Sequence, residues 1–482
     1  MRTKRLYINT MGCQMNVYDS DQIRNRLASL GYVPVDAPEG ADLIIVNTCA
    51  IRDKAEQKAF SFLGRLAPLK TVKPDLIIGI GGCVAQQEGR KILSRMPYVD
   101  LVFGTHAIAR LPRTIERISA TRCRVVDVAL SEGVEAEDFV SGPLVTSDVS
   151  AFVTIMRGCD NYCTYCVVPY VRGRESSRAP DAILDEIRHL VNHGVREVTL
   201  LGQNVNSYGL KEGLPGFDQL LEQVNRVEGL ARIRFTTSHP KDLSDALMHA
   251  FGRLEKLCPH IHLPVQSGSD VVLKRMNRRY SSGQYLEKVA RLRQIRPEMA
   301  ITSDIIVGFP GESEQDFAAT LELIRQVRFD SLFAFIYSDR PNAPAVRFDG
   351  KIAEAVKKER LQRVLAFQER ITAQKHQAMI GDVHLVLVDG PSKHPSSTAD
   401  SPPSDGQSEP GQWAGRTGGN KIVHFAGEGQ AGAPNQILTG RMMPIMIERA
   451  MAHSLWGRPV PDPRASAVEG EPLCCIKPAW PV

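Results

Sequence analysis

The sequence predicts an α/β protein with three parts in series: a doubly wound parallel sheet, a partial (β/α)6 TIM-like barrel, and a small C-terminal β-barrel. Three observations support this prediction. Apolar strand-like segments alternate with helical ones through the first hundred residues, the alternation resumes with six further strands, and the last hundred residues become rich in Gly and Pro. A chain of 482 residues is long enough for two or three such domains.

The first part has short, largely apolar strands, as expected of strands buried on both faces of a parallel sheet. We predict them at residues 6–10, 43–46, 76–80 and 99–103. The predicted helices between them begin near Asp19 and end at Gly31, cover residues 54–66, and begin after Gln86. We expect this domain to occupy residues 1–135.

The second part contains six strand candidates separated by helical patterns such as 182–192, 246–257 and 317–327. The predicted strands are residues 152–156, 197–201, 233–237, 261–265, 301–307 and 332–337. Six βα units are too few for an eight-fold barrel but are sufficient for a partial one. We expect this domain to occupy residues 145–380.

The third part begins with a strand-like segment at 383–388 and has short β-like segments at 421–425 and 443–447. These predict a small OB-like β-barrel over residues 381–450. Ser, Pro, Asp, Gly and Gln dominate residues 391–412, which predicts a disordered insertion. Residues 451–482 form a Pro-rich tail, and we interpret its adjacent Cys474 and Cys475 as incidental thiols.

Composition limits the class of protein. The formal net charge of +5 is a mild basic excess that is compatible with an RNA partner. No apolar stretch has the length of a membrane span, and the N-terminus has no apolar signal core, so we expect a cytoplasmic protein with no membrane partner. The ten cysteines should be reduced there, so clustered ones are better interpreted as ligands or catalysts than as disulfides.

The strongest local signal is the C-x-x-x-C-x-x-C pattern of Cys159, Cys163 and Cys166, which follows the first strand of the predicted barrel. Thiolates are soft ligands that suit iron–sulfur clusters or zinc. Three of them leave one iron of a cubane free, and the amino and carboxylate groups of S-adenosyl-L-methionine could chelate that iron. Tyr165 could pack against the adenine. The alternatives are a zinc site, which usually has a fourth nearby ligand, or a redox thiol pair.

A second trio, Cys13, Cys49 and Cys83, is spread through the first part of the chain. Each cysteine follows a predicted strand, and the carboxyl ends of parallel strands share one edge of a sheet, where a crevice opens. The three thiols can therefore converge. The alternative is that they are small buried hydrophobic residues. Flanking loop formers such as Gly12 argue against that alternative.

Motifs around both trios resemble those of the radical-SAM methylthiotransferase family over residues 6–337, and more weakly to residue 447. The motifs near the second trio and in the barrel resemble the branch that modifies isopentenylated adenosine in tRNA. The motifs are Arg157-Gly158-Cys159, Val168-Pro169-Tyr170, Arg172-Gly173-Arg174-Glu175, Met11-Gly12-Cys13-Gln14-Met15-Asn16, Asn47-Thr48-Cys49, Gly81-Gly82-Cys83-Val84-Ala85-Gln86, Thr236-Thr237-Ser238-His239-Pro240, His262-Leu263-Pro264-Val265-Gln266-Ser267-Gly268 and Met276-Asn277-Arg278-Arg279-Tyr280.

The resemblance implies a transferase that methylthiolates carbon 2 of N6-dimethylallyladenosine beside the anticodon of tRNA. It implies two [4Fe-4S] clusters, the radical-SAM cluster on Cys159, Cys163 and Cys166 and an auxiliary cluster on Cys13, Cys49 and Cys83. It also implies a C-terminal TRAM domain that contacts RNA. We expect a monomer that meets the tRNA anticodon stem-loop and an electron donor such as flavodoxin or ferredoxin; the sulfur donor is not implied.

Gln203, Ser238 and Gln266 would lie near the S-adenosylmethionine pocket according to the resemblance, although turn chemistry is an equally good interpretation of such residues. Arg172 could meet the cofactor carboxylate or RNA phosphates, or could lie on a solvated face.

Other functions stay open. A sister branch of the family acts on threonylcarbamoyladenosine in tRNA or on a ribosomal protein. The branch that acts on a ribosomal protein typically has Pro-Lys where Gln14-Met15 stands here. A non-catalytic zinc RNA-binding protein and a redox-sensing cluster protein are the alternatives from other classes. The segment 338–344 departs from the family's usual Arg-Pro-Gly-Thr-Pro form. The insertion in the C-terminal domain is a second departure from the family's pattern.

Overall fold

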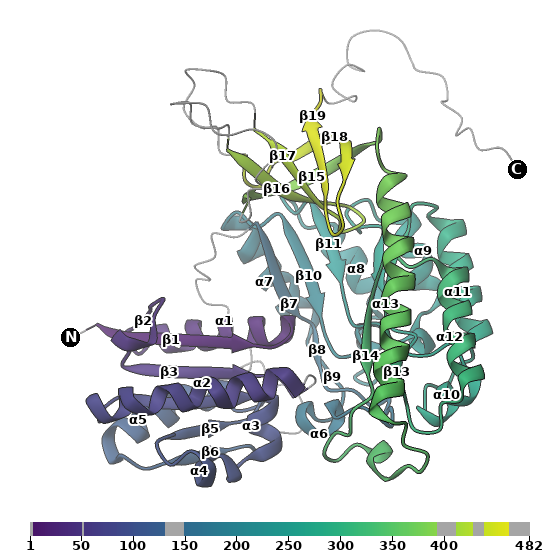
Figure 1. Ribbon diagram of the computed structural model, residues 1–482. Helices are drawn as coiled ribbons and strands as arrows, with labels where there is room; N and C mark the ends of the chain where they lie inside the picture. Colours follow the sequence, from purple (N-terminus) through teal and green to yellow (C-terminus); the bar gives the residue numbers. More distant parts are fainter. Residues whose placement is uncertain (1–2, 51–52, 131–148, 393–410, 428–437, 462–482) are drawn as a thin grey trace, which may run out of the picture. The chain divides into compact units, whose positions relative to one another are not determined.

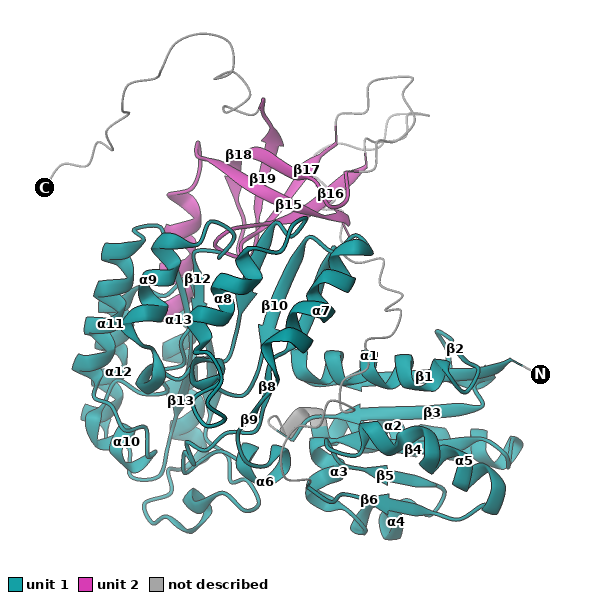
Figure 2. Ribbon diagram, turned by 180° about the vertical axis from the view of Figure 1, so that it is seen from behind, with its two compact units in different colours: residues 1–366 teal, residues 367–482 magenta. Residues whose placement is uncertain are grey.

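The computed structural model describes residues 3–50, 53–130, 149–392, 411–427 and 438–461. The chain forms two compact units, Met1–Ala366 and Phe367–Val482 (Figure 2). Most of the insertion predicted at 391–412 lies outside the described residues, as does the tail from 462 with Cys474 and Cys475. The two ends of the predicted insertion, Pro391 and Gln412, are strand residues instead.

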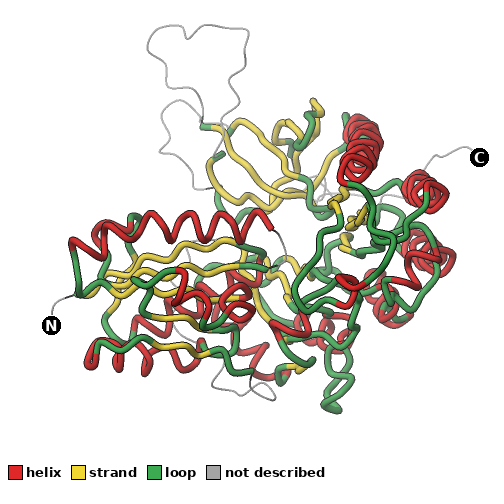
Figure 3. The backbone as a smooth tube through the Cα atoms, turned by 60° about the horizontal axis from the view of Figure 1, so that its bottom comes forward, coloured by secondary structure: helices red, strands yellow, loops and turns green. Residues whose placement is uncertain are grey.

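The first unit begins with a six-stranded parallel sheet in the order β2-β1-β3-β4-β5-β6 (Figures 1 and 3). The strands are β1 (Lys4–Met11), β2 (Tyr32–Pro34), β3 (Leu43–Thr48), β4 (Ile77–Gly82), β5 (Leu101–Phe103) and β6 (Val125–Asp127). The helices are α1 (Gln14–Ala28), α2 (Asp53–Val72), α3 (Cys83–Glu88), α4 (Lys91–Arg95) and α5 (Leu111–Thr121).

Helices cover both faces of this sheet, as the apolar strands predict. Leu43 and Ile45 of β3 pack in one apolar cluster with α1 and α5. Ile44 and Val46 point to the opposite face and pack with α2, α3 and α4. All four side chains are fully buried, because successive residues of a strand point to opposite faces of the sheet.

The same unit continues with two three-stranded parallel sheets, β11-β10-β7 and β12-β13-β14, whose strands follow one another in chain order as in a partial barrel. The strands are β7 (Ser150–Thr154), β10 (Glu197–Leu201), β11 (Arg232–Phe235), β12 (His260–His262), β13 (Ala300–Val307) and β14 (Ser331–Ile336), with a separate short pair β8 (Met156–Arg157) and β9 (Ser176–Ser177). All six predicted strands are confirmed.

Helices flank these strands (Figure 1). They are α6 (Val168–Arg172), α7 (Pro180–Asn192), α8 (Phe217–Asn225), α9 (Asp245–Arg253), α10 (Asp270–Arg275), α11 (Ser282–Ile295), α12 (Glu314–Val327) and α13 (Glu354–Gln377). Short 3-10 turns are η1 (Pro38–Gly40), η2 (Ile108–Arg110), η4 (Val205–Ser207), η5 (Pro240–Asp242) and η6 (Pro344–Arg347). In α7, Ile183, Ile187 and Leu190 recur at helical spacing and are fully buried.

The second unit is a closed five-stranded barrel in the order β15-β16-β17-β19-β18, closed by pairing of β18 with β15. The strands are β15 (Val383–Pro391), β16 (Gln412–Thr417), β17 (Ile422–Ala426), β18 (Met442–Ala450) and β19 (Leu455–Pro459). Val386, Val423, Phe425 and Ile445 are buried in its core. The predicted C-terminal β-barrel is confirmed, and β19 extends it beyond residue 450, where the sequence had placed its end.

Two helices begin earlier than predicted. Helix α1 starts directly after Cys13, not near Asp19, and α3 starts at Cys83, not after Gln86. The reason is unusual N-terminal capping. Cys13 takes the capping position, with its backbone N–H donating to Asn16 Oδ1, and Gly82 precedes α3 with φ +89°. Neither has the Ser, Thr or Asp that usually marks a helix start.

No helix in the described part of the chain is both long and apolar enough to cross a membrane.

Candidate metal centres

The N-terminal cysteines meet at the carboxyl edge of the first sheet. Met11 of β1 pairs with Thr48 of β3, and Thr48 pairs with Gly82 of β4, so the three strands end in register. Cys13 lies two residues past the first strand end, and Cys49 and Cys83 each lie one residue past theirs. In the order β2-β1-β3, the chain reverses direction across the sheet between β1 and β3, and this is where such folds bind ligands.

Two asparagines hold the three strand ends together. Asn16 Nδ2 donates to Asn47 Oδ1 at 3.1 Å and to the Thr48 carbonyl at 3.0 Å, and Asn47 Nδ2 donates to the Asn16 carbonyl at 2.9 Å. Both asparagines are buried. A Cβ on Gly82 would come within 2.3 Å of the Thr48 carbonyl oxygen, so only glycine fits beside β3 at this point. These contacts fix the backbone from which the thiols project.

Cys13 and Cys83 differ in their readiness to ionise. A hydrogen bond with Cys49, helped by the charge of Arg172, lowers the pKa of Cys13 from 9.0 to about 6 against the effect of burial. Burial raises the pKa of Cys83, and the Arg172 guanidinium acts in the opposite direction. Cys13 is therefore largely a thiolate at neutral pH, the form that binds metal.

The second trio lies in the loop between β8 and α6. Burial raises the pKa of Cys159 to about 11 and that of Cys166 to about 12, and the charge of Cys163 acts in the same direction on both. Nitrogen donors point at the sulfurs: the Val168 N–H is 3.4 Å from Cys166 Sγ, and Asn161 Nδ2 is 3.6 Å from Cys159 Sγ. N–H donors around thiolates are typical of iron–sulfur sites, where they tune the cluster.

Two further contacts to Cys163 come from distant parts of the barrel. Arg278 Nη1 lies 3.4 Å from Cys163 Sγ, and His239 Nε2 lies 3.9 Å from it. Arg278 is buried and also donates to the Pro264 carbonyl. Burial and then the charge of Arg278 lower the pKa of His239, which is therefore neutral. Sequence reasoning assigned neither residue a role; the quoted motifs that contain them were the available signal.

Unsatisfied polar atoms surround the same region. Ser238 Oγ and Gln266 Oε1 are buried, and neither has a hydrogen-bond partner among the described residues. Gln203 Oε1 accepts the backbone N–H of Gly158, next to Cys159. A buried polar atom without a partner costs about 1–3 kcal/mol, which a polar ligand would recover. Soft thiolates beside unsatisfied polar atoms are a donor set that fits a cluster with S-adenosylmethionine.

Tyr165 and Arg172 have other surroundings. Tyr165 packs in an apolar cluster that includes Met276 and Phe309, and its hydroxyl accepts from Arg278 Nη1 at 3.3 Å. Arg172 is buried and pairs with Asp19 at 2.8 Å, close to the N-terminal thiols. The predicted contacts of both residues with S-adenosylmethionine stay predictions.

No group of three or more His, Cys, Asp or Glu side chains in the described residues is close enough to hold one metal ion.

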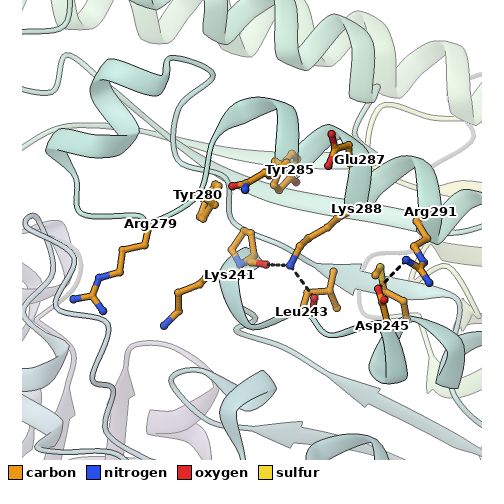
Figure 4. A pocket seen from close by; sticks show the side chains of 12 residues that line it. Lys241, Leu243, Asp245, Arg279, Tyr280, Tyr285, Glu287, Lys288 and Arg291 are labelled. Carbon is orange, nitrogen blue, oxygen red and sulfur yellow. Dashed lines mark hydrogen bonds and ion pairs between the residues drawn. The ribbon is translucent and has the colours of Figure 1, made fainter.

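A pocket of about 410 Å³ adjoins the Arg278 segment (Figure 4). Lys241 and Arg279 extend to the same side of it, while Lys288 donates to the carbonyls of Pro240 and Leu243. Cations outnumber carboxylates in its lining, which is Pro240, Lys241, Leu243, Asp245, Met248, Arg279, Tyr280, Gln284, Tyr285, Glu287, Lys288 and Arg291.

Comparison with known proteins agrees with this geometry. Residues 153–324 match the family model of the radical SAM superfamily, and residues 5–104 match "Uncharacterized protein family UPF0004". The fold resembles that of a radical S-adenosylmethionine methyltransferase, TsrM, from Kitasatospora setae, with a TM-score of 0.55 and 12% identity over 83% of this chain and 82% of that one. The fold and the three-cysteine loop define a radical SAM enzyme, a class that uses a [4Fe-4S] cluster and S-adenosylmethionine.

Sequence relatives narrow the class. The tRNA-2-methylthio-N(6)-dimethylallyladenosine synthase of Desulfosudis oleivorans is 56% identical over 94% of this chain and 96% of its own length. The protein of the same name from Syntrophus aciditrophicus is 50% identical over 94% of each chain, and that from Syntrophotalea carbinolica is 48% identical over 95% of this chain and 100% of its own. The chain belongs to the tRNA-2-methylthio-N(6)-dimethylallyladenosine synthase family and is a radical SAM methylthiotransferase.

Proposed function

We propose that this enzyme methylthiolates carbon 2 of N6-dimethylallyladenosine beside the anticodon of tRNA, using two [4Fe-4S] clusters and S-adenosylmethionine. Family membership supports the reaction and the substrate. The single observation that supports the two-cluster form is the presence of two cysteine trios in one compact unit. The cysteines of one trio follow three separate strand ends, and those of the other share one short loop.

Cys159, Cys163 and Cys166 would hold the first cluster, and Cys13, Cys49 and Cys83 the auxiliary one. When bound, the first cluster with S-adenosylmethionine supplies radical hydrogen abstraction from a carbon that polar chemistry activates poorly. The unsatisfied Ser238 Oγ and Gln266 Oε1 would bind polar groups of the cofactor. The same two residues would fix the cofactor's orientation relative to the substrate base.

The chain's own residues also suit an RNA substrate. Lys241 and Arg279 at the pocket beside the Arg278 segment would contact backbone phosphates of the anticodon stem-loop. Arg416, Lys421, Arg441 and Arg449 would serve the same purpose on the C-terminal barrel. The target adenine must leave the base stack to be reached, as in other enzymes that act on a base. An electron donor such as flavodoxin or ferredoxin would complete the system.

The test compares three alanine variants of anaerobically reconstituted protein. Cys163→Ala should lose both 5′-deoxyadenosine formation and the methylthiolated nucleoside, since the first cluster cannot assemble. Cys49→Ala should lose iron and the methylthiolated nucleoside but still form 5′-deoxyadenosine. Cys123→Ala, at a half-buried thiol outside both trios, is the matched control and should behave as the parent.

Mass spectrometry of tRNA nucleosides reads the product, and 5′-deoxyadenosine is measured by chromatography. Persisting 5′-deoxyadenosine in Cys163→Ala would contradict the cluster assignment. Methylthiolation of threonylcarbamoyladenosine or of a ribosomal protein, with isopentenylated tRNA untouched, would contradict the substrate.

A further inference from the structure

We propose that Arg172 is a positioning residue of the N-terminal cysteine site, where its guanidinium donates an N–H···S hydrogen bond to the sulfur of the cluster or of its thiolate ligands. The radical SAM core would thereby supply one outer contact of the auxiliary cluster. The inference deepens the proposed function, because it requires that Cys13, Cys49 and Cys83 hold that cluster.

The position of Arg172 is fixed from both sides. It is the last residue of α6, six positions after Cys166. The Thr105 hydroxyl donates to the Val171 carbonyl at 2.9 Å, and His106 Nε2 donates to the Arg172 carbonyl at 3.0 Å, so the loop after β5 holds the end of α6 against the N-terminal sheet. The side chain of Arg172 then enters the region between the two halves of the first unit.

The two terminal nitrogens of the Arg172 guanidinium have different surroundings. Nη2 donates to Asp19 Oδ2 of α1 at 2.8 Å, and the two side chains are 4% and 5% exposed. Nη1 is equally buried but has no hydrogen-bond partner among the described residues. Leaving a buried charged donor without a partner is expensive, so Nη1 is expected to find an acceptor in the assembled site.

Sulfur is the acceptor within reach. A side-chain hydrogen bond joins Arg172 to Cys83. The charge of Arg172 also acts on both Cys13 and Cys83. Thiolate and sulfide sulfurs accept hydrogen bonds from N–H groups, and such bonds raise the reduction potential of a cluster. Asp19 holds one side of the guanidinium in place, which is how outer groups orient a metal site.

The chain offers a matched control in Arg178. It pairs with Glu186 at 2.7 Å, and the side chains are 3% and 5% exposed. The Tyr18 hydroxyl of α1 donates to Glu186 at 3.2 Å, so this pair also joins α1 to the core. Arg178 also donates to the carbonyls of Thr154 and Ala182. A purely structural role would make Arg172 and Arg178 behave alike.

The experiment uses the full chain with Cys159, Cys163 and Cys166 replaced by alanine, so that only the N-terminal trio can take up iron. After anaerobic reconstitution, iron and sulfide are counted per chain, and the midpoint potential is measured by EPR-monitored titration. Arg172→Lys keeps the charge but loses the fork. We expect it to retain iron and to shift the potential to a more negative value, whereas Arg178→Lys should leave the potential of the parent unchanged.

Equal potentials in the parent and Arg172→Lys would overturn the inference. So would equal shifts or equal iron losses in the Arg172 and Arg178 variants, which indicate a structural role alone. In the chain with all cysteines present, weaker S-adenosylmethionine binding by Arg172→Lys without a change of the N-terminal potential would assign Arg172 to the cofactor instead. A parent that takes up no iron would refute the proposed auxiliary cluster itself, and the inference with it.

Discussion

Gly158→Ala should disable the first cluster while leaving the rest of the fold in place. Gly158 precedes Cys159 and has φ +72°, a conformation that costs a residue with a Cβ about 1–2 kcal/mol. The added Cβ would also lie 2.0 Å from the Arg174 carbonyl oxygen, a backbone atom. Ordinary contact begins at 3.4 Å, so the two backbone segments must separate by about 1.4 Å.

This separation moves the cluster loop, because the Cys159 N–H donates to the Gly173 carbonyl at 3.4 Å across the same crossing. Displacements of about 1 Å at a catalytic geometry can cost on the order of 100-fold in rate. We therefore expect Gly158→Ala to form 5′-deoxyadenosine at least about 100-fold more slowly, and to lose iron from the first trio only. Iron counting in the Cys49→Ala background, where the N-terminal site is disabled, isolates that loss.

The matched control is Gly194→Ala. Gly194 has φ +97°, but a Cβ there would have no neighbour within 4 Å. This variant carries the backbone cost of about 1–2 kcal/mol without the collision, and should keep iron and turnover while its unfolding midpoint falls. The reasoning is refuted if Gly158→Ala retains the iron and turnover of the parent, or if Gly194→Ala loses them as well.

Three further predictions concern stability and ionisation. Arg360→Leu should lower the free energy of unfolding by about 3–5 kcal/mol in urea titrations, because it leaves Glu312, 1% exposed, without the partner 2.7 Å away. In the metal-free protein, alkylation of Cys13 by iodoacetamide should have a pH midpoint near 6, and Cys49→Ala should raise it, because that hydrogen bond is the largest cause of the low pKa. Burial and then the charges of nearby carboxylates raise the pKa of Glu175 from 4.5 to about 7, so Glu175 stays protonated to a higher pH in the folded state than in the unfolded chain. The free energy of unfolding should therefore fall by at most about 3 kcal/mol as the pH rises through this range. Glu175→Gln should flatten this pH dependence.

Each of these has a contradicting outcome. Arg363→Leu removes an exposed arginine of α13 and should cost less than about 1 kcal/mol; an equal cost for both arginines would refute the buried-pair argument. A Cys13 midpoint near that of an ordinary thiol would show that Cys49 and Arg172 do not act as described. Melting temperatures of Glu175→Gln that follow the parent's pH dependence would exclude Glu175 as its source.

The elements that the sequence predicted well have strong local patterns. β10 and β13 are rich in apolar and β-branched residues, and Glu197–Leu201 was predicted to the residue. The starts of α1 and α3 were missed because Cys13 and Gly82 take positions where Ser, Thr or Asp usually signals a helix. β2 and β6 are three residues each, too short for a periodic pattern to register.

The site residues also differ in whether a local sequence pattern marks them. The cysteine trios could be predicted because spacing and strand ends mark them. The Arg172–Asp19 pair joins residues 153 positions apart, and Arg278 reaches Cys163 across 115 positions. No local pattern encodes such a contact, since a charged residue near a loop is usually solvated. Tertiary packing determines which of these charges become buried.

The buried ion pair and the buried hydrogen bond of α1 also bear on how chimeric enzymes of this family could be made. Asp19 and Tyr18 on one side face Arg172 and Glu186 on the other. A hybrid that takes its first hundred residues from one parent and its core from another will inherit only half of each pair, unless the parents agree at all four positions. Recombination would then leave a buried charge without its partner, so these four residues should be exchanged together.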